Sequence, residues 1–244
     1  MQFFFDHLIA TFVGVTLTVA LMTQQVNTRQ AALERISVYS AKTQSLAFAE
    51  WLEDDVIKLG SRFGGARDRF TMASSAVGSA RYTDRFEFYY NDAAKAGTVV
   101  ERVEVRYVLE PDTDTRVVVE RGATDADDVT VDLYRLRRSE RRGDWDTAED
   151  EVTGDPAGWI GTAPDWVVSA DYATPAGLRH FQIQPLDSEG RPFDDTNAPD
   201  DYALRADYVR LQFTVVPTLF PLDKARIVPK EGLHWATTIE LRPF

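Results

Sequence analysis

Residues Phe3–Met22 read FFFDHLIATFVGVTLTVALM, an apolar run with one carboxylate, Asp6, and one histidine, His7, near its start. An α-helix rises about 1.5 Å per residue, so a helix of this length spans roughly 30 Å and matches the hydrocarbon core of a bilayer. The run therefore predicts that the chain is anchored in a membrane, or bundled with other helices, by its N-terminal end.

Two other interpretations of the apolar run are weaker. A secretory signal peptide has basic residues before its apolar region and small residues at a cleavage site. Here Met1-Gln2 supplies no positive charge, and Met22–Gln25 is a poor cleavage site. A helix buried in a soluble domain usually stops short of this length.

The helical pattern continues past the apolar run because residues 23–59 contain neither Gly nor Pro. In this second part apolar residues recur at spacings of three and four, which places them on one face, while the acidic residues and Lys58 lie on the other. We expect one helix of about 55 residues, or roughly 80 Å. Its apolar half (residues 1–28) suits lipid, and its amphipathic half (residues 29–60) suits packing on a globular head. The predicted core stripe is Leu46, Ala49, Leu52, Val56 and Leu59, and the opposite face is Glu50, Glu53, Asp54 and Lys58.

After the helix, residues 61–80 are rich in Gly, Ser and Ala and predict a connecting loop. From Arg81 the hydrophobic period changes to two, which is typical of half-buried strands. Residues 81–244 therefore predict a β-rich head, and the expected fold class is α+β, with a long N-terminal helix packed on antiparallel β-sheets. We expect strands around Phe86–Tyr89 and at Val99–Leu109, Thr115–Glu120, Val129–Arg135, Trp166–Tyr172, Phe181–Gln184, Tyr208–Val215 and Trp235–Leu241. Turns are expected at Pro111-Asp112, Gly122, Gly143, Gly154–Pro156, Ser188–Gly190 and Pro217, and two long acidic connections at residues 137–164 and 191–201.

Composition excludes several classes of function. The net charge of −12 is the opposite of what nucleic acids and anionic lipid headgroups attract, so we expect no nucleic-acid partner. The chain has no Cys, which excludes disulfides, thiolate metal sites and thiol nucleophiles. No catalytic motif is present, and the three histidines, His7, His180 and His234, are far apart in the sequence. We therefore expect a protein that is not an enzyme.

The acidic connections raise the question of a Ca²⁺ site, since hard cations take oxygen ligands. No stretch has the spacing of a known calcium loop, and a solvated acidic loop explains the same residues, so no cofactor is expected and Ca²⁺ stays an open alternative. The candidate oxygens are those of Asp194, Asp195, Asn197, Asp200 and Asp201, or of Asp125, Asp127 and Asp128.

Three tryptophans, Trp145, Trp159 and Trp166, fall in or beside the first acidic connection. They could form a binding surface for a partner or a glycan. The alternative is that they close a core or anchor the loop, as large aromatic side chains more often do.

Several segments, taken in order, resemble one group of proteins. They are the apolar helix with its early Asp6, Val105–Glu110, Leu133–Arg135, Leu178–Gln184, the turn Asp187–Gly190, Tyr208–Val215 and Thr237–Arg242. Their order and spacing resemble the type IV pilin-fold proteins, in particular the minor pseudopilin J and minor pilin W group of type II secretion systems and type IV pili. The resemblance covers nearly the whole chain.

The resemblance implies a pilin-like fold and a structural role. The subunit would wait as a single-pass protein in the cytoplasmic membrane with its head outside. Its helix would then move into a periplasmic or extracellular filament, or into a tip complex, among other pilin-like or pseudopilin-like subunits. Asp6 would pair with the N-terminal amine of a neighbour. The small residues Ala10 and Gly14, four apart, would allow close helix packing.

Two alternatives remain at this stage. Asp6 could instead sit at the membrane surface and complement the positive end of the helix dipole. The whole chain could be a single-pass envelope protein whose β domain binds a ligand or glycan without entering a filament. The positive-inside rule gives no help with orientation, because no Lys or Arg precedes the apolar run while Arg29 and Arg35 follow it.

Overall fold

The computed structural model describes residues 2–59, 70–77, 80–94, 97–120, 129–146, 158–172, 176–193, 206–217 and 232–241. Within these ranges the chain forms one long helix and one antiparallel sheet. The predicted α+β class is confirmed.

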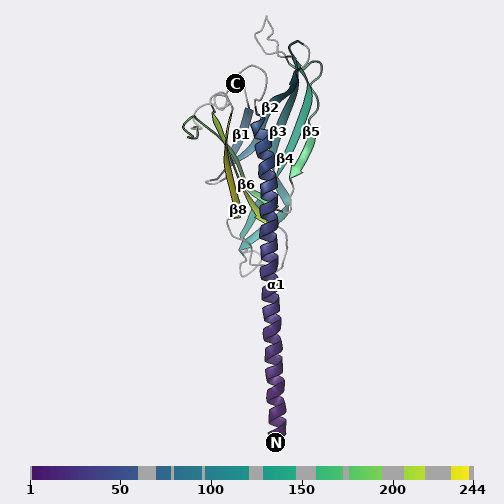
Figure 1. The fold of residues 1–244 in the computed structure, drawn as a ribbon, viewed down its shortest axis with the longest axis vertical. Coiled ribbons are helices and arrows are strands. Elements are labelled where there is room, and N and C mark those ends of the chain that lie inside the picture. Colours follow the sequence, from purple (N-terminus) through teal and green to yellow (C-terminus); the bar gives the residue numbers. More distant parts are fainter. Residues whose placement is uncertain are drawn as a thin grey trace.

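Helix α1 spans Gln2–Ile57, 56 residues without interruption, which confirms the single long helix expected from the sequence. It ends in a tighter turn, in which the backbone N–H groups of Lys58 and Leu59 donate to the carbonyls of Asp55 and Val56. The C-terminal half of α1 lies against the sheet, and the N-terminal half protrudes from the head as a bare rod (Figure 1).

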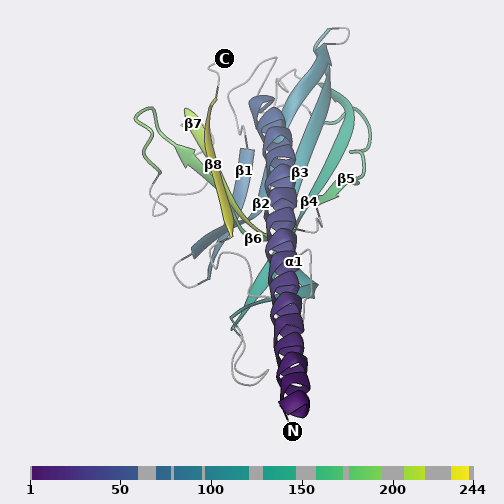
Figure 2. The same cartoon turned by 60° about the horizontal axis from the view of Figure 1, so that its bottom comes forward.

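The sheet has eight strands in the order β1-β2-β3-β4-β6-β7-β8, and β5 pairs with β4 beside this path. In both views the sheet curves around the upper half of α1, with β6, β7 and β8 on one side and β3, β4 and β5 on the other (Figures 1 and 2). The strands are β1 (Phe70–Val77), β2 (Ala80–Ala94), β3 (Val99–Glu120), β4 (Val129–Asp146), β5 (Val167–Tyr172), β6 (Ala176–Leu186), β7 (Tyr208–Pro217) and β8 (Leu233–Glu240).

The core lies between α1 and the face of the sheet that is turned toward it, called here the inner face. Period-two alternation places every second residue of a strand on this face. In β3, for example, Val103, Val105, Tyr107 and Leu109 are all buried. From the helix, Phe48 meets Phe213 of β7 edge to face at 4.8 Å, and Trp51 meets Tyr107 of β3 at 5.4 Å. Helix and sheet therefore share a single core.

The predicted core stripe of α1 is right at four positions and wrong at one. Ala49, Leu52, Val56 and Leu59 are buried, but Leu46 is 48% exposed. Phe48 occupies the core instead, because it lies seven residues after the buried Ala41 and four before the buried Leu52, and so on the same side of the helix; its ring packs on Phe213. The packed part also begins later than the predicted boundary at residue 29, since the first buried side chain among those described along α1 is that of Ser37.

The predicted loop over residues 61–80 is wrong in its second half, where β1 pairs with β2 from Phe70↔Phe88 to Val77↔Ala80. The exposed side chains of this edge strand are small or polar, so it shows no hydrophobic period. The period therefore gives no sign of a strand.

Two predicted interruptions of the longest strands are also wrong. Strand β3 runs through Pro111-Asp112 with a register shift between Asp112 and Arg116, and β4 runs through Gly143 to Asp146. Pro111 pairs with Tyr134 in the regular register, and the pairing resumes at Arg116 after the shift, so the strand does not end at the proline. The predicted acidic connection from residue 137 is therefore strand over its first ten residues.

Candidate functional site

The protruding half of α1 is the most unusual surface of the described chain. Its large apolar side chains are each at least 51% exposed: Phe5, Leu8, Ile9, Phe12, Val13, Val15, Leu17, Val19, Leu21, Met22 and Val26. The helix is long and apolar enough to cross a membrane, and none of its most apolar window is buried. These properties are compatible with a single-pass membrane anchor.

Threonines within the apolar segment satisfy their own hydroxyl groups. Thr11, Thr16 and Thr18 donate to the carbonyls of His7, Phe12 and Gly14, four residues earlier, at 2.8–2.9 Å. A free hydroxyl would be costly in lipid or in a dry helix bundle, because neither supplies water as a partner. The segment therefore suits an apolar surrounding better than its composition alone suggests.

The three predicted assembly residues, Asp6, Ala10 and Gly14, follow one another at intervals of four and so lie along one side of α1. Ala10 and Gly14 are exposed, and a Cβ added at Gly14 would meet nothing within 4 Å. The backbone of Asp6 belongs to α1, and its side chain lies outside the described part. Among the described residues, none of the head packs against Ala10 or Gly14.

A second apolar stripe lies on α1 above the apolar run, on the side turned away from the sheet. Ile36, Tyr39 and Leu46 are 58%, 73% and 48% exposed, and Ile57 near the helix end is 54% exposed. The first three are separated by three and seven residues, the spacing of a helix-packing seam. We call these four residues the outer stripe.

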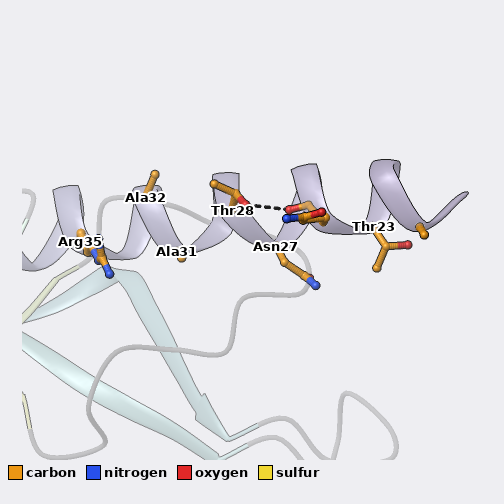
Figure 3. A pocket seen from close by; sticks show the side chains of 8 residues that line it. Thr23, Asn27, Thr28, Ala31, Ala32 and Arg35 are labelled. Atoms are coloured by element: carbon orange, nitrogen blue, oxygen red, sulfur yellow. Dashed lines mark hydrogen bonds between the residues drawn. The ribbon is translucent and has the colours of Figure 1, made fainter. Parts of the chain in front are cut away.

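A shallow groove of about 760 Å³ runs along α1 just below the head. Thr23, Asn27, Ala31 and Arg35 point to one side of the helix there, and Thr28 donates to the Gln24 carbonyl (Figure 3). The described residues that line the groove all belong to α1, and the groove is open to one side rather than a closed cavity.

Asp55 forms the one strongly polar contact described inside the helix–sheet core. Its carboxylate is buried, with 4% of the side chain exposed, and accepts hydrogen bonds from the Tyr107 hydroxyl at 2.5 Å and from Arg138 Nε at 2.7 Å. Lys58 Nζ lies 3.5 Å away on the next helical turn. The contact joins the end of α1 to β3 and β4.

Arg138 extends this contact to the edge of the sheet. Its guanidinium pairs with Glu140 at 2.6 Å, donates to the Ser169 hydroxyl of β5 and lies over the Trp51 ring. Burial works against the charge of Arg138, but hydrogen bonds to Asp55 and Glu140 outweigh it and raise the pKa of the guanidinium. Burial, reinforced by the Asp55 carboxylate, also raises the pKa of the Tyr107 phenol well above its usual value.

The Asp55 cluster is a structural contact rather than a reactive one. Each of its groups already has a partner within the chain, and only 4% of the Asp55 side chain is exposed to solvent. Sequence reasoning missed Asp55, although a signal was present. The residue is three after Leu52 and four before Leu59, and so lies on the stripe predicted to be buried.

The three tryptophans pack on the face of the sheet away from α1, the outer face. Arg102 lies between the rings of Tyr89 at 3.6 Å and Trp145 at 3.8 Å. Trp166 lies beneath Arg106 and Arg141, and Trp159 stands at right angles to Trp145. Cation–π contacts of this kind hold the segment before β5 against the sheet. Of the two predicted roles, loop anchoring is the one that these contacts support.

The predicted Ca²⁺ ligands Asp194, Asp195, Asn197, Asp200 and Asp201, and the alternatives Asp125, Asp127 and Asp128, lie outside the described residues. Among the residues that are described, no group of three or more His, Asp or Glu side chains is arranged to hold a metal ion.

Comparison of the chain with protein-family models, with curated proteins and with solved structures gave no match.

Proposed function

We propose that the chain is a non-enzymatic structural subunit of the minor pilin or pseudopilin kind, which assembles through α1 into a type IV-type filament or its tip complex. The observation that carries the proposal is that the two halves of one uninterrupted helix have different surroundings. Its upper half is part of the head's core, and every large apolar side chain from Phe5 to Val26 is exposed. A surface of that size requires lipid or other helices to cover it.

The outer stripe favours helices over lipid alone. A membrane anchor needs about 20 apolar residues, and the apolar run already supplies them. Ile36, Tyr39 and Leu46 lie 14 to 24 residues beyond Met22, roughly 20–35 Å further along the helix, where lipid does not reach. Exposed apolar residues at that height are explained by neighbouring helices that run beside α1 in an assembly.

The connection between helix and head also suits an assembling subunit. The helix has no Gly or Pro between residues 23 and 59, and Asp55 ties its end to Tyr107 and Arg138. A displacement of the helix is therefore passed to the head as a rigid body. In the proposed cycle the subunit waits in the cytoplasmic membrane with its head outside, and then leaves lipid for the helical core of the assembly.

Replacing Asp6 with Ala is expected to impair assembly while leaving the head folded. In lipid or a helical core, a carboxylate is tolerated when it meets a cation, and the proposal assigns that role to the N-terminal amine of a neighbouring subunit. The measurement is the amount of the Asp6→Ala variant, relative to the unchanged protein, in the sheared-filament or tip-complex fraction of native cells. Circular dichroism of the purified variant checks the head.

The matched control is Asp54→Ala, the same chemical change at an exposed position of the same helix. We expect this variant to assemble normally. Normal incorporation of Asp6→Ala would show that Asp6 does not set the register between subunits and would count heavily against the proposal.

A further inference from the structure

Charged residues share the outer side of α1 with the outer stripe, and their two signs are separated along the helix. The cation Lys42 lies toward the apolar run, whereas the carboxylates Glu50 and Glu53 lie toward the end of the helix. Lys42 and Glu50 are exposed, and Glu53 is half-buried. With three residues of the outer stripe they follow one another at intervals of three or four, which places them on one side of the helix. These six residues, called here the charged seam, are Tyr39, Lys42, Leu46, Glu50, Glu53 and Ile57.

No ion pair within the described part of the chain uses the charges of the seam. The described ion pairs of α1 are those of Asp55 with Lys58 and Arg138, and the Asp55 carboxylate is buried against the sheet. In Figure 1 the upper half of α1 passes in front of the sheet, and no described strand crosses its near side. The charged seam is therefore open to a partner that lies beside the helix.

The charges distinguish among the ways in which a second copy of α1 could lie along the seam. Two parallel copies at the same height would oppose Lys42 to Lys42 and Glu50 to Glu50, which is unfavourable. An antiparallel pair would bring opposite signs together, but two chains anchored in one membrane extend in the same direction. A parallel pair that is displaced along the helix axis is the arrangement that remains.

One displacement brings opposite charges and apolar residues into contact together. Lys42 and Glu53 are eleven residues apart, as are Leu46 and Ile57. Eleven residues are close to three full helical turns, so the same side of each helix stays at the contact, and the displacement is roughly 16 Å. In this register no two residues of the seam with like charge lie opposite each other.

We propose that the charged seam binds a second copy of this chain, parallel to the first and displaced by about three helical turns. Lys42 and Leu46 of the higher copy lie beside Glu53 and Ile57 of the lower copy. Each copy thus offers one end of its seam to the copy above and the other end to the copy below, so the contact continues as a row of subunits instead of closing as a pair. The inference rests on the function proposed above and names the partner at this surface.

The apolar and the charged residues of the seam have different roles in this contact. Tyr39, Leu46 and Ile57 are 73%, 48% and 54% exposed in the single chain, and their burial between two helices favours association. An exposed ion pair adds little affinity. Lys42 and Glu53 therefore act mainly by disfavouring the registers in which like charges meet.

Disulfide formation between two copies tests the displacement, because the chain has no Cys of its own. Two differently tagged full-length copies, one with Tyr39→Cys and one with Glu50→Cys, are produced together in native cells, and the membrane and sheared-filament fractions are oxidised. Tyr39 and Glu50 are also eleven residues apart, and both lie on the seam without belonging to the proposed ion pair. A disulfide requires Cα atoms about 4.4–6.8 Å apart, so we expect the 39–50 product and no 39–39 product.

Exchange of charges tests whether the partner is a copy of this chain. Lys42→Glu or Glu53→Lys, introduced into both tagged copies, is expected to lower the yield of the 39–50 product at least about threefold, because like charges then meet. The double variant Lys42→Glu with Glu53→Lys is expected to restore the yield, because every copy then supplies both exchanged charges. Asp54→Lys, the same kind of change at an exposed position off the seam, is the control and is expected to leave the yield unchanged.

Three outcomes would overturn the inference. They are a 39–39 product in place of the 39–50 product, no disulfide between copies, and single variants that lower the yield without restoration by the double variant. If position 39 nevertheless cross-links to the helices of other pilin-like chains, the proposed assembly stands and only the identity of the partner is wrong. Circular dichroism confirms that each variant is folded.

Discussion

Replacing Asp55 with Ala is expected to lower the free energy of unfolding of the head by about 3–5 kcal/mol, the usual result of removing one partner from a buried ion pair. The guanidinium of Arg138, only 8% exposed, would keep Glu140 but lose the carboxylate that holds its Nε at 2.7 Å. The Tyr107 hydroxyl would lose its acceptor at the same time. Urea unfolding of the full chain in detergent micelles, followed by tryptophan fluorescence, measures the loss.

Asp54→Ala is the matched control for Asp55→Ala, because the neighbouring Asp54 is exposed. We expect it to change stability by no more than about 0.5 kcal/mol. A double variant, Asp55→Leu with Arg138→Met, should lose less than the sum of the two single changes, because neither partner is then left alone. A loss below about 1 kcal/mol for Asp55→Ala would contradict the structural role of the cluster.

Replacing Phe213 with Ala is expected to cost about 3–5 kcal/mol, since the change removes a buried ring and leaves a cavity. Phe213 is fully buried in β7, where it meets Phe48 of α1 edge to face and stacks on Trp235 of β8, both with ring centroids 4.8 Å apart. The ring therefore joins helix and sheet in a single core. Urea unfolding as above gives the size of the effect.

The control for Phe213→Ala is Thr238→Ala in the neighbouring strand β8, where the side chain is exposed. We expect this change to stay within about 0.5 kcal/mol. If Phe213→Ala proves as stable as Thr238→Ala, α1 does not share its core with the sheet.

The elements with a sustained period were the ones that the sequence could predict. The helix was predictable because an apolar pattern is followed by an amphipathic one that contains neither Gly nor Pro between residues 23 and 59. Strands such as β7, where Val209, Leu211, Phe213 and Val215 are all buried, were predictable from alternation. These patterns arise because buried side chains recur at the spacing of the helix or strand, so they can be recognised in the sequence.

The features that were missed depend on contacts between distant segments. Gly143 looks like a turn residue, but in β4 it leaves room for Trp159 and Pro164, whose side chains would lie about 3 Å from an added Cβ. Asp55 looks like one more acid of an exposed face until its partners Tyr107 and Arg138, 52 and 83 residues away, are known. The spacing of residues within one segment does not show which residues from so distant a segment will contact it.

Of the candidate site, too, the sequence predicted one part and missed another. The apolar anchor was evident from composition, whereas the outer stripe was not, because Leu46 was assigned to the core and Tyr39 to no face at all. Only the burial of Phe48 and Ala41 on the opposite side shows that Ile36, Tyr39 and Leu46 are turned outward. This stripe distinguishes a helix that packs on other helices from one that only holds the chain in lipid.

Photo-cross-linking from position 39 tests the proposed assembly most directly, since Tyr39 is 73% exposed and lies above the membrane-spanning run. A photoreactive amino acid would replace Tyr39 in native cells, and Ala236 on β8 would be replaced in the same way as a control. The account predicts that position 39, and not position 236, cross-links to the N-terminal helices of other pilin-like chains, identified by mass spectrometry. A position 39 that yields no cross-link to any other helix would contradict it.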